Sequence, residues 1–118
     1  DSNTTDVVHS LSINSLTFGR GPGNILSNVA VGSAALNSNV TGFSNVAVGE
    51  FTLSSNTIGY LNTAVGKYAL LNNTSGLNNA AFGAYALRNN SFGYQNAAFG
   101  NDALNSNTKA QSQSTYHH

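Results

Sequence analysis

Residues 62–79 read NTAVGKYALLNNTSGLNN, and the chain repeats this pattern with a period of seventeen residues. Each repeat opens with a pentad Asn-x-Ala-x-Gly, a leucine follows four residues after the glycine, and a second asparagine follows three residues after the leucine. A fixed period with invariant columns is typical of repeat proteins, in which each unit stacks on the next. The two asparagine columns are Asn28, Asn45, Asn62, Asn79 and Asn96, and Asn39, Asn56, Asn73, Asn90 and Asn107.

The pentad is the best candidate for a strand, because its small and bulky residues alternate. Its odd positions are Asn, Ala and Gly in all five repeats, whereas its even positions hold mainly Val, Ala and Phe. A period of two places these sets on opposite faces of a strand. Because neither face carries a charge, we expect both to be buried, one inside the coil and one against another chain.

The rest of the repeat is less regular. The Gly-x-x-Ala-Leu half is short enough to form either a second strand or one helical turn. Residues 39–42, 56–59, 73–76 and 90–93 each begin with Asn and end with Gly, which predicts a tight bend, since both residues tolerate positive φ. If one repeat makes one rung, equivalent asparagines form ladders along the stack, and Glu50 faces Lys67 as a surface ion pair.

The chain divides into three segments on this pattern. Residues 1–24 are predicted to form a polar N-terminal segment and a capping strand that ends in a cluster of turn-forming residues, Gly19 to Asn24. The five repeats occupy residues 25–108. Residues 109–118 are predicted to be a disordered tail, in which His117 and His118 look like the remnant of a purification tag.

A coil of this length has a narrow interior, with one Leu and a few small residues per rung. At about 25 cal/mol per Å², such burial leaves little margin over the conformational entropy of the chain. Association of several chains would supply the missing burial. The sequence therefore predicts an all-β, repetitive β-solenoid or β-roll with one 17-residue repeat per rung, assembled as a parallel homotrimeric fibre.

The composition argues against several classes of partner. Charged residues make up only 7% of the 118 residues, the net charge is zero, and the basic residues Arg20, Lys67, Arg88 and Lys109 are scattered. Binding of nucleic acid needs clustered Lys and Arg, so it is not expected. The chain has no cysteine, which excludes disulfides and Cys-based metal sites. No apolar run approaches the roughly 20 residues of a membrane span, so membrane insertion is not expected.

The repeat, shown most fully by residues 62–79, resembles the tandem repeats of bacteriophage tail-fibre proteins, and residues 16–21 resemble the segment that leads into them. The resemblance covers residues 14–108 and implies a trimeric, β-rich fibre segment on the virion, outside the cell, that takes part in host attachment. The pentads at 28–32 and 45–49 are also similar to repeats in the heads of trimeric autotransporter adhesins, which form a left-handed β-roll with a shorter repeat.

No catalytic, cofactor or metal site is expected. Glu50 and Asp102 stand three repeats apart, about 15 Å in a regular stack, which does not suit paired-carboxylate hydrolysis. His9 with Asp6 is a weak candidate for a metal site, and solvation at a flexible terminus is the simpler interpretation. The Gly19-Arg20-Gly21 segment lacks the further glycines or lysine of a phosphate loop and is read as a turn.

Two aromatic columns are the candidate ligand-binding residues. Tyr68 and Tyr85 share a column with Phe51, and Tyr60 and Tyr94 share another with Phe43 and Leu77. Such columns present flat rings to sugars or pack between chains, and packing is the favoured interpretation.

Three functions remain to be compared. The leading hypothesis is a structural and adhesive fibre segment that binds itself and a host surface glycan or another receptor. An ice-binding β-solenoid is the alternative, supported by the partial threonine column of Val40, Thr57, Thr74, Ser91 and Thr108. The head segment of a bacterial trimeric adhesin is a second alternative. An enzyme, such as a glycan depolymerase on a β-helical spike, is not expected, because that catalysis needs carboxylates in a groove and the chain has only four acidic residues.

Overall fold

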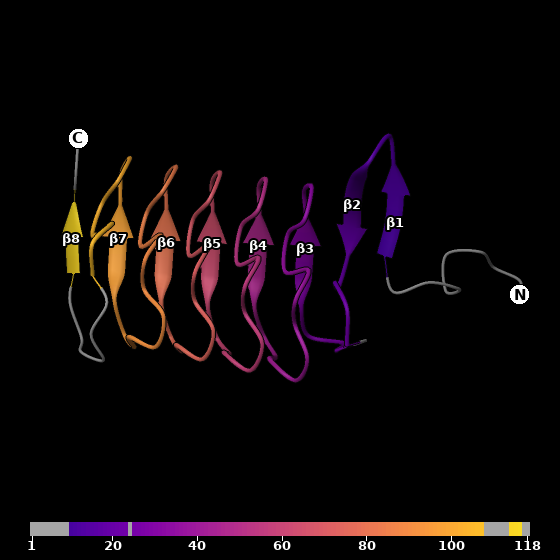
Figure 1. The fold of residues 1–118 in the computed structure, drawn as a ribbon, viewed down its shortest axis with the longest axis horizontal. Coiled ribbons are helices and arrows are strands. Elements are labelled where there is room, and N and C mark those ends of the chain that lie inside the picture. The colour runs from indigo at the N-terminus through magenta and orange to yellow at the C-terminus, as the bar shows by residue number, and fades with distance from the viewer. Residues whose placement is uncertain (1–9, 24, 108–113, 117–118) are drawn as a thin grey trace, which may run out of the picture.

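The computed structural model describes residues 10–23, 25–107 and 114–116, and the described residues are all-β without a helix. Their strands form one sheet of eight, in which each strand neighbours the next in sequence (Figure 1). The strands are β1 (Ser10–Ile13), β2 (Leu16–Gly19), β3 (Val29–Val31), β4 (Val46–Val48), β5 (Thr63–Val65), β6 (Ala80–Phe82), β7 (Ala97–Phe99) and β8 (Ser114–Tyr116).

One repeat forms one rung of a β-solenoid, as the sequence predicts. Strands β3 to β7 pair in parallel, and each central alanine lies opposite its equivalent seventeen residues later, for example Ala47 opposite Ala64. Figure 1 shows the connecting loops of successive rungs following the same path beside the sheet. Because each residue lies above its counterpart, every column of the repeat becomes a line of side chains along the stack.

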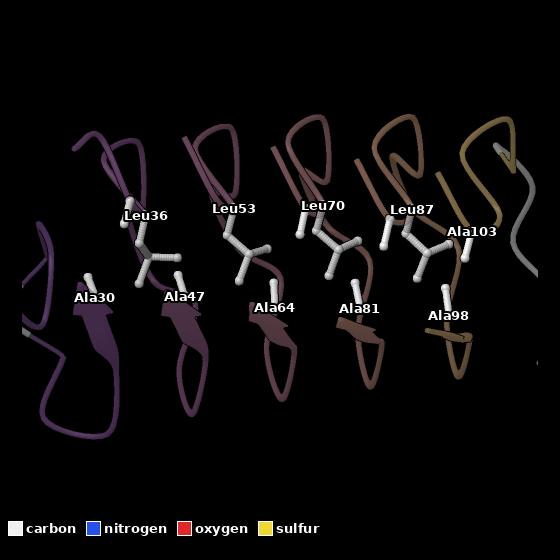
Figure 2. Packing of buried hydrophobic residues seen from close by; sticks show 13 residues of the cluster. Ala30, Leu36, Ala47, Leu53, Ala64, Leu70, Ala81, Leu87, Ala98 and Ala103 are labelled. Atoms are coloured by element: carbon white, nitrogen blue, oxygen red, sulfur yellow. The ribbon is translucent and has the colours of Figure 1, made fainter. Parts of the chain in front are cut away.

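The small face of the pentad lines the interior of the coil. The strand alanines are fully buried, and the leucines extend from the turns toward them (Figure 2). The core contains one leucine and small residues in each rung, so it is as narrow as the repeat length implies. The bulky face points away from the core and remains partly exposed in the single chain, and its expected burial against another chain stays a prediction.

The Gly-x-x-Ala-Leu half is neither a strand nor a helical turn. It consists of two successive turns, closed in the first rung by Ala35 N donating to Gly32 O (3.3 Å) and Asn39 N donating to Leu36 O (3.3 Å). Leu36 has a φ of 55°, in the left-handed region. That conformation costs about 1–2 kcal/mol for a residue with a Cβ, whereas full burial of a leucine side chain contributes about 1.5–3 kcal/mol, so burial prevails.

The predicted bend at residues 39–42 is present, but the reason given for its Asn and Gly is wrong. Neither Asn39 nor Gly42 has positive φ. The N–H groups of residues 40, 41 and 42 converge instead on one acceptor, Thr57 O of the next rung, at 2.9, 3.0 and 3.3 Å. A Cβ on Gly42 would overlap the carbonyl oxygen of Gly59, so close stacking between rungs requires glycine here.

The N-terminal cap is a hairpin and not the single strand that the sequence predicts. Strands β1 and β2 are antiparallel, and the turn between them uses Asn14 and Ser15, with φ of 52° and 68°. Two successive residues of positive φ are typical of a two-residue hairpin loop whose twist matches that of the strands. Strand β2 then runs antiparallel to β3, so the hairpin covers the first rung.

The C-terminal prediction needs a correction at residues 114–116, which were assigned to a disordered tail. They form β8, parallel to β7, with Ala97 opposite Ser114 at the usual spacing of seventeen residues. A parallel ladder is made by backbone groups, so it can continue although the Asn-x-Ala-x-Gly motif has ended. Residues 109–113 and 117–118, like residues 1–9, lie outside the described part of the chain.

Candidate functional site: the outer faces of the solenoid

The two asparagine columns form hydrogen-bonded ladders inside the coil. In the first, Asn62 Nδ2 donates to Gly76 O (2.9 Å), and Asn62 Oδ1 accepts from the backbone N–H of Asn79 (3.0 Å). In the second, Asn73 Nδ2 donates to Asn56 Oδ1 at 2.8 Å. These side chains are buried. They satisfy backbone groups that would each cost about 1–3 kcal/mol if left unpaired, so their role is structural.

The outward face of the strands, here called the outer sheet face, is an uncharged apolar surface. It consists of the even pentad residues of strands β3 to β7, and one of its columns continues through strand pairing into the N-terminal hairpin. Phe82 and Phe99 stack on it with ring centroids 4.9 Å apart. The continuous column consists of Leu11, Phe18, Val31, Val48, Val65, Phe82 and Phe99.

Tyr60 and Tyr94 are not brought together, since Leu77 lies between them in their column. Tyr60 stacks instead on Phe43, with ring centroids 4.6 Å apart and planes within 7°. This stacking covers the face of the Tyr60 ring that lies against Phe43, so a ligand cannot stack on that face. Leu26 continues the column at 80% exposure, which makes the column largely apolar.

Tyr68 and Tyr85 do lie together. Their ring centroids are 5.2 Å apart and their planes are nearly perpendicular, and Phe51 meets Tyr68 in the same edge-to-face manner. Lys67 Nζ lies 5.2 Å from the centroid of the Tyr68 ring, and the Arg88 guanidinium lies 5.2 Å from that of Tyr85. We call Lys67, Tyr68, Tyr85 and Arg88 the cation–tyrosine strip.

The charged side chains of the repeats gather on the turns that carry this strip. Glu50 and Lys67 form the expected ion pair, at 3.8 Å, and both side chains are about half-exposed. Such an exposed pair contributes little to stability. Residues 25–107 contain only two further charges, Arg88 and Asp102. The solenoid is therefore divided into an apolar outer sheet face and a charged turn surface.

The candidate metal and phosphate sites can be compared with the structure only within the described residues. Among the described residues, no three His, Cys, Asp or Glu side chains come close enough to hold a metal ion. His9 and Asp6 lie outside these residues. Gly19 pairs with Ala30 at the end of β2, and Gly21 has a φ of 76°, as expected for a turn. Nor do the described residues include a helix that is long and apolar enough to cross a membrane.

Sequence reasoning missed two features of these surfaces. It did not extend the outer sheet face into β1 and β2, because the hairpin lies outside the repeat. It also did not place Arg88 beside Tyr85, although the spacing of three residues was a usable signal. A turn closed by Arg88 N donating to Tyr85 O (3.2 Å) brings the two side chains together.

Comparison with known proteins adds no relative: no family model, no curated protein and no solved structure matches this chain.

Proposed function

We propose that this chain is a structural and adhesive segment of a bacteriophage tail fibre, located on the virion, that takes part in attachment to the host surface. The observation that carries the proposal is the uncovered outer sheet face. An apolar surface that crosses seven strands without a charge is typical of a surface that another protein covers. The resemblance of the repeat to tail-fibre repeats supports the viral assignment.

The partner that suits the outer sheet face is another copy of the same chain. Its columns run along the stack and stay in line from rung to rung, so a parallel copy meets the same apolar surface along its whole length. The charged turn surface stays in solvent in this arrangement. The proposed assembly is a parallel homotrimer. The number of chains comes from the resemblance to tail-fibre repeats and not from the geometry of the single chain. No nucleic acid or membrane partner is proposed.

Sedimentation velocity tests the assembly. The wild-type chain is expected to sediment at three times its 12.2 kDa mass. The double substitution Val48→Lys and Val65→Lys places two charges on the outer sheet face and is expected to give a monomer, because burying them unpaired costs several kcal/mol. The control is Ile58→Lys, which places a lysine at an exposed apolar residue on a turn outside the outer sheet face and should leave the trimer intact.

A wild-type chain that sediments as a monomer would contradict the proposed assembly, and so would a trimer that survives both lysines. Adhesion is tested separately on the intact trimer with a glycan array, where binding to at least one class of surface glycan is expected. An array without any bound glycan would contradict glycan recognition and leave the structural assignment standing.

The structure weighs against the ice-binding alternative. The hydroxyls of the threonine column are turned to the backbone, since Thr57 Oγ1 donates to Thr74 O (3.2 Å) and Thr74 Oγ1 donates to Ser91 O (3.3 Å). The next column along the turn is Thr41, Ile58, Ser75 and Phe92, so no second rank of threonines runs beside it. We therefore expect no thermal hysteresis.

The alternative of a bacterial adhesin head shares the same trimer and the same adhesive role.

A further inference from the structure

The repeat region, residues 25–107, carries only four charged residues, and their signs follow a regular order along the solenoid. Glu50, Lys67, Arg88 and Asp102 belong to four successive rungs, so the sequence of signs is negative, positive, positive, negative. Lys67 lies one rung after Glu50 in the same column, and Asp102 lies one rung after Tyr85 in the column of the strip. The positive centre of this surface is therefore two rungs long and is bounded at both ends by a carboxylate.

The hydrogen-bond donors at this centre are largely unused by the residues that the structure describes. Arg88 contacts the Tyr85 ring, and neither its guanidinium nor the hydroxyls of Tyr68 and Tyr85 form a hydrogen bond with any described residue. Among the described residues, Lys67 contacts the ring of Tyr68 and pairs with Glu50, in a half-exposed ion pair of small value. Two phenol hydroxyls and a guanidinium fork on adjoining, partly exposed rungs are thus able to donate to an oxyanion.

We propose that the cation–tyrosine strip binds the single carboxylate of an acidic sugar within a surface glycan. The guanidinium of Arg88 accepts the carboxylate in a bidentate contact, the hydroxyls of Tyr68 and Tyr85 donate to it or to the adjacent sugar hydroxyls, and Lys67 adds positive potential. This inference rests on the proposed adhesive function and specifies the chemistry of its ligand.

The flanking residues restrict the ligand further. Glu50 and Asp102 repel a second anionic group one rung away on either side, so the strip favours one isolated acidic sugar over a polyanion. Beside Arg88, Asn72 Nδ2 donates to Asn89 Oδ1 (3.0 Å), which leaves Asn72 Oδ1 and the Asn89 amide donors for neutral sugar hydroxyls.

Calorimetric titration of the full chain tests the inference. The probes are oligosaccharides that carry one glucuronic, galacturonic or sialic acid, each compared with its carboxyl-reduced form, together with sodium acetate and a heparin hexasaccharide. At least one acidic probe is expected to bind about tenfold more tightly than its reduced form, which is the usual value of one good charge-assisted contact. Acetate and the heparin fragment are expected to bind more weakly than that probe.

Substitutions locate the site on the strip. Arg88→Gln is expected to abolish the preference for the acidic probe, Arg88→Lys to retain part of it, and Tyr85→Phe to weaken binding several-fold. The control Thr41→Ala removes an exposed hydroxyl from a bend outside both aromatic columns and should change nothing. Glu50→Gln combined with Asp102→Asn is expected to strengthen binding of the heparin fragment, because the flanking repulsion is removed.

Two results would overturn the inference: no acidic probe binds better than its reduced form, or Arg88→Gln and Arg88→Lys both keep the full preference. Sedimentation of the same samples separates this failure from failure of the proposed function. A wild-type trimer that binds neutral glycans but shows no acidic preference refutes the strip alone, whereas a monomer that binds no glycan refutes the adhesive fibre.

Discussion

Asn62, in the middle of the first asparagine column, forms hydrogen bonds to the rungs on both sides. Its Nδ2 donates to Asn45 Oδ1 (3.2 Å), and its Oδ1 accepts from the backbone N–H of Asn79. The N–H of Asn79 is buried with it, so no water can replace the lost acceptor. The invariance of the column therefore has a local cause, because each amide from Asn28 to Asn79 accepts the backbone N–H of the asparagine in the next rung.

Asn62→Ala is expected to lower the free energy of unfolding by about 2–3 kcal/mol, because it leaves a buried donor unpaired. Urea denaturation at fixed protein concentration measures the change. The control is Asn72→Ala, which removes an exposed amide and should cost less than about 0.5 kcal/mol. Equal losses at the two positions would contradict the structural role assigned to the buried ladder.

At Ala34, whose φ is 61°, a substitution is expected to raise the free energy of unfolding instead of lowering it. Ala34→Gly removes about 1–2 kcal/mol of left-handed strain and adds less than about 1 kcal/mol of unfolded-state entropy, so a small gain in stability is expected. Gly66→Ala is the contrasting change, because a Cβ there would lie 2.7 Å from the backbone of Gly83. Thermal denaturation should show a higher melting temperature for Ala34→Gly and a much lower one for Gly66→Ala.

At the scale of the element, the rung is the unit of the fold. Each rung contributes one short strand, two turns and one bend, and its hydrogen bonds reach only the rungs next to it. Most of the fold could be predicted from this period, including the parallel stacking and the ion pair of Glu50 with Lys67. The two turns around Leu36 could not, because a buried leucine with positive φ contradicts its local preference and is explained only by tertiary burial.

Deletion of whole rungs tests this modularity. Removal of residues 62–78 joins Leu61 to Asn79 and keeps every column in line, so the shortened chain is expected to fold with one rung fewer. Removal of sixteen residues, 62–77, shifts every following column by one position and turns the small face of the later strands outward. Circular dichroism should show a cooperative β-sheet transition for the first variant only. Similar transitions for both would contradict strict register.

At the scale of the whole molecule, the separation of apolar and charged surfaces is the main finding. The core of each rung is too small to account for much stability, and the outer sheet face offers the additional apolar area. Of the candidate ligand residues, sequence columns placed Tyr68 and Tyr85 together correctly. The columns did not place Arg88 beside them, because that contact runs within one rung, across the turn that Arg88 N closes with Tyr85 O, and not along a column.

Coupling of folding to assembly predicts a melting temperature that rises with protein concentration, since dilution favours the separated chains by mass action. Over a hundredfold range of concentration, a rise of several degrees is expected for the wild-type chain. The monomeric variant with lysine at positions 48 and 65 should melt at a lower temperature that is independent of concentration. A wild-type melting temperature that does not depend on concentration would contradict the assembly.

The seventeen-residue spacing was enough to predict the stacked rungs and the ladder columns, because register in a parallel stack depends only on the length of the repeat. The alternation of small and bulky residues in the pentad predicted two unlike strand faces. The folded chain was needed to show that the small pentad face lines the interior and the bulky one points outward, that a hairpin caps the first rung, and that a further strand follows the last motif. These features arise from backbone pairing and from the path of the turns, which bring together residues that no spacing in the sequence connects.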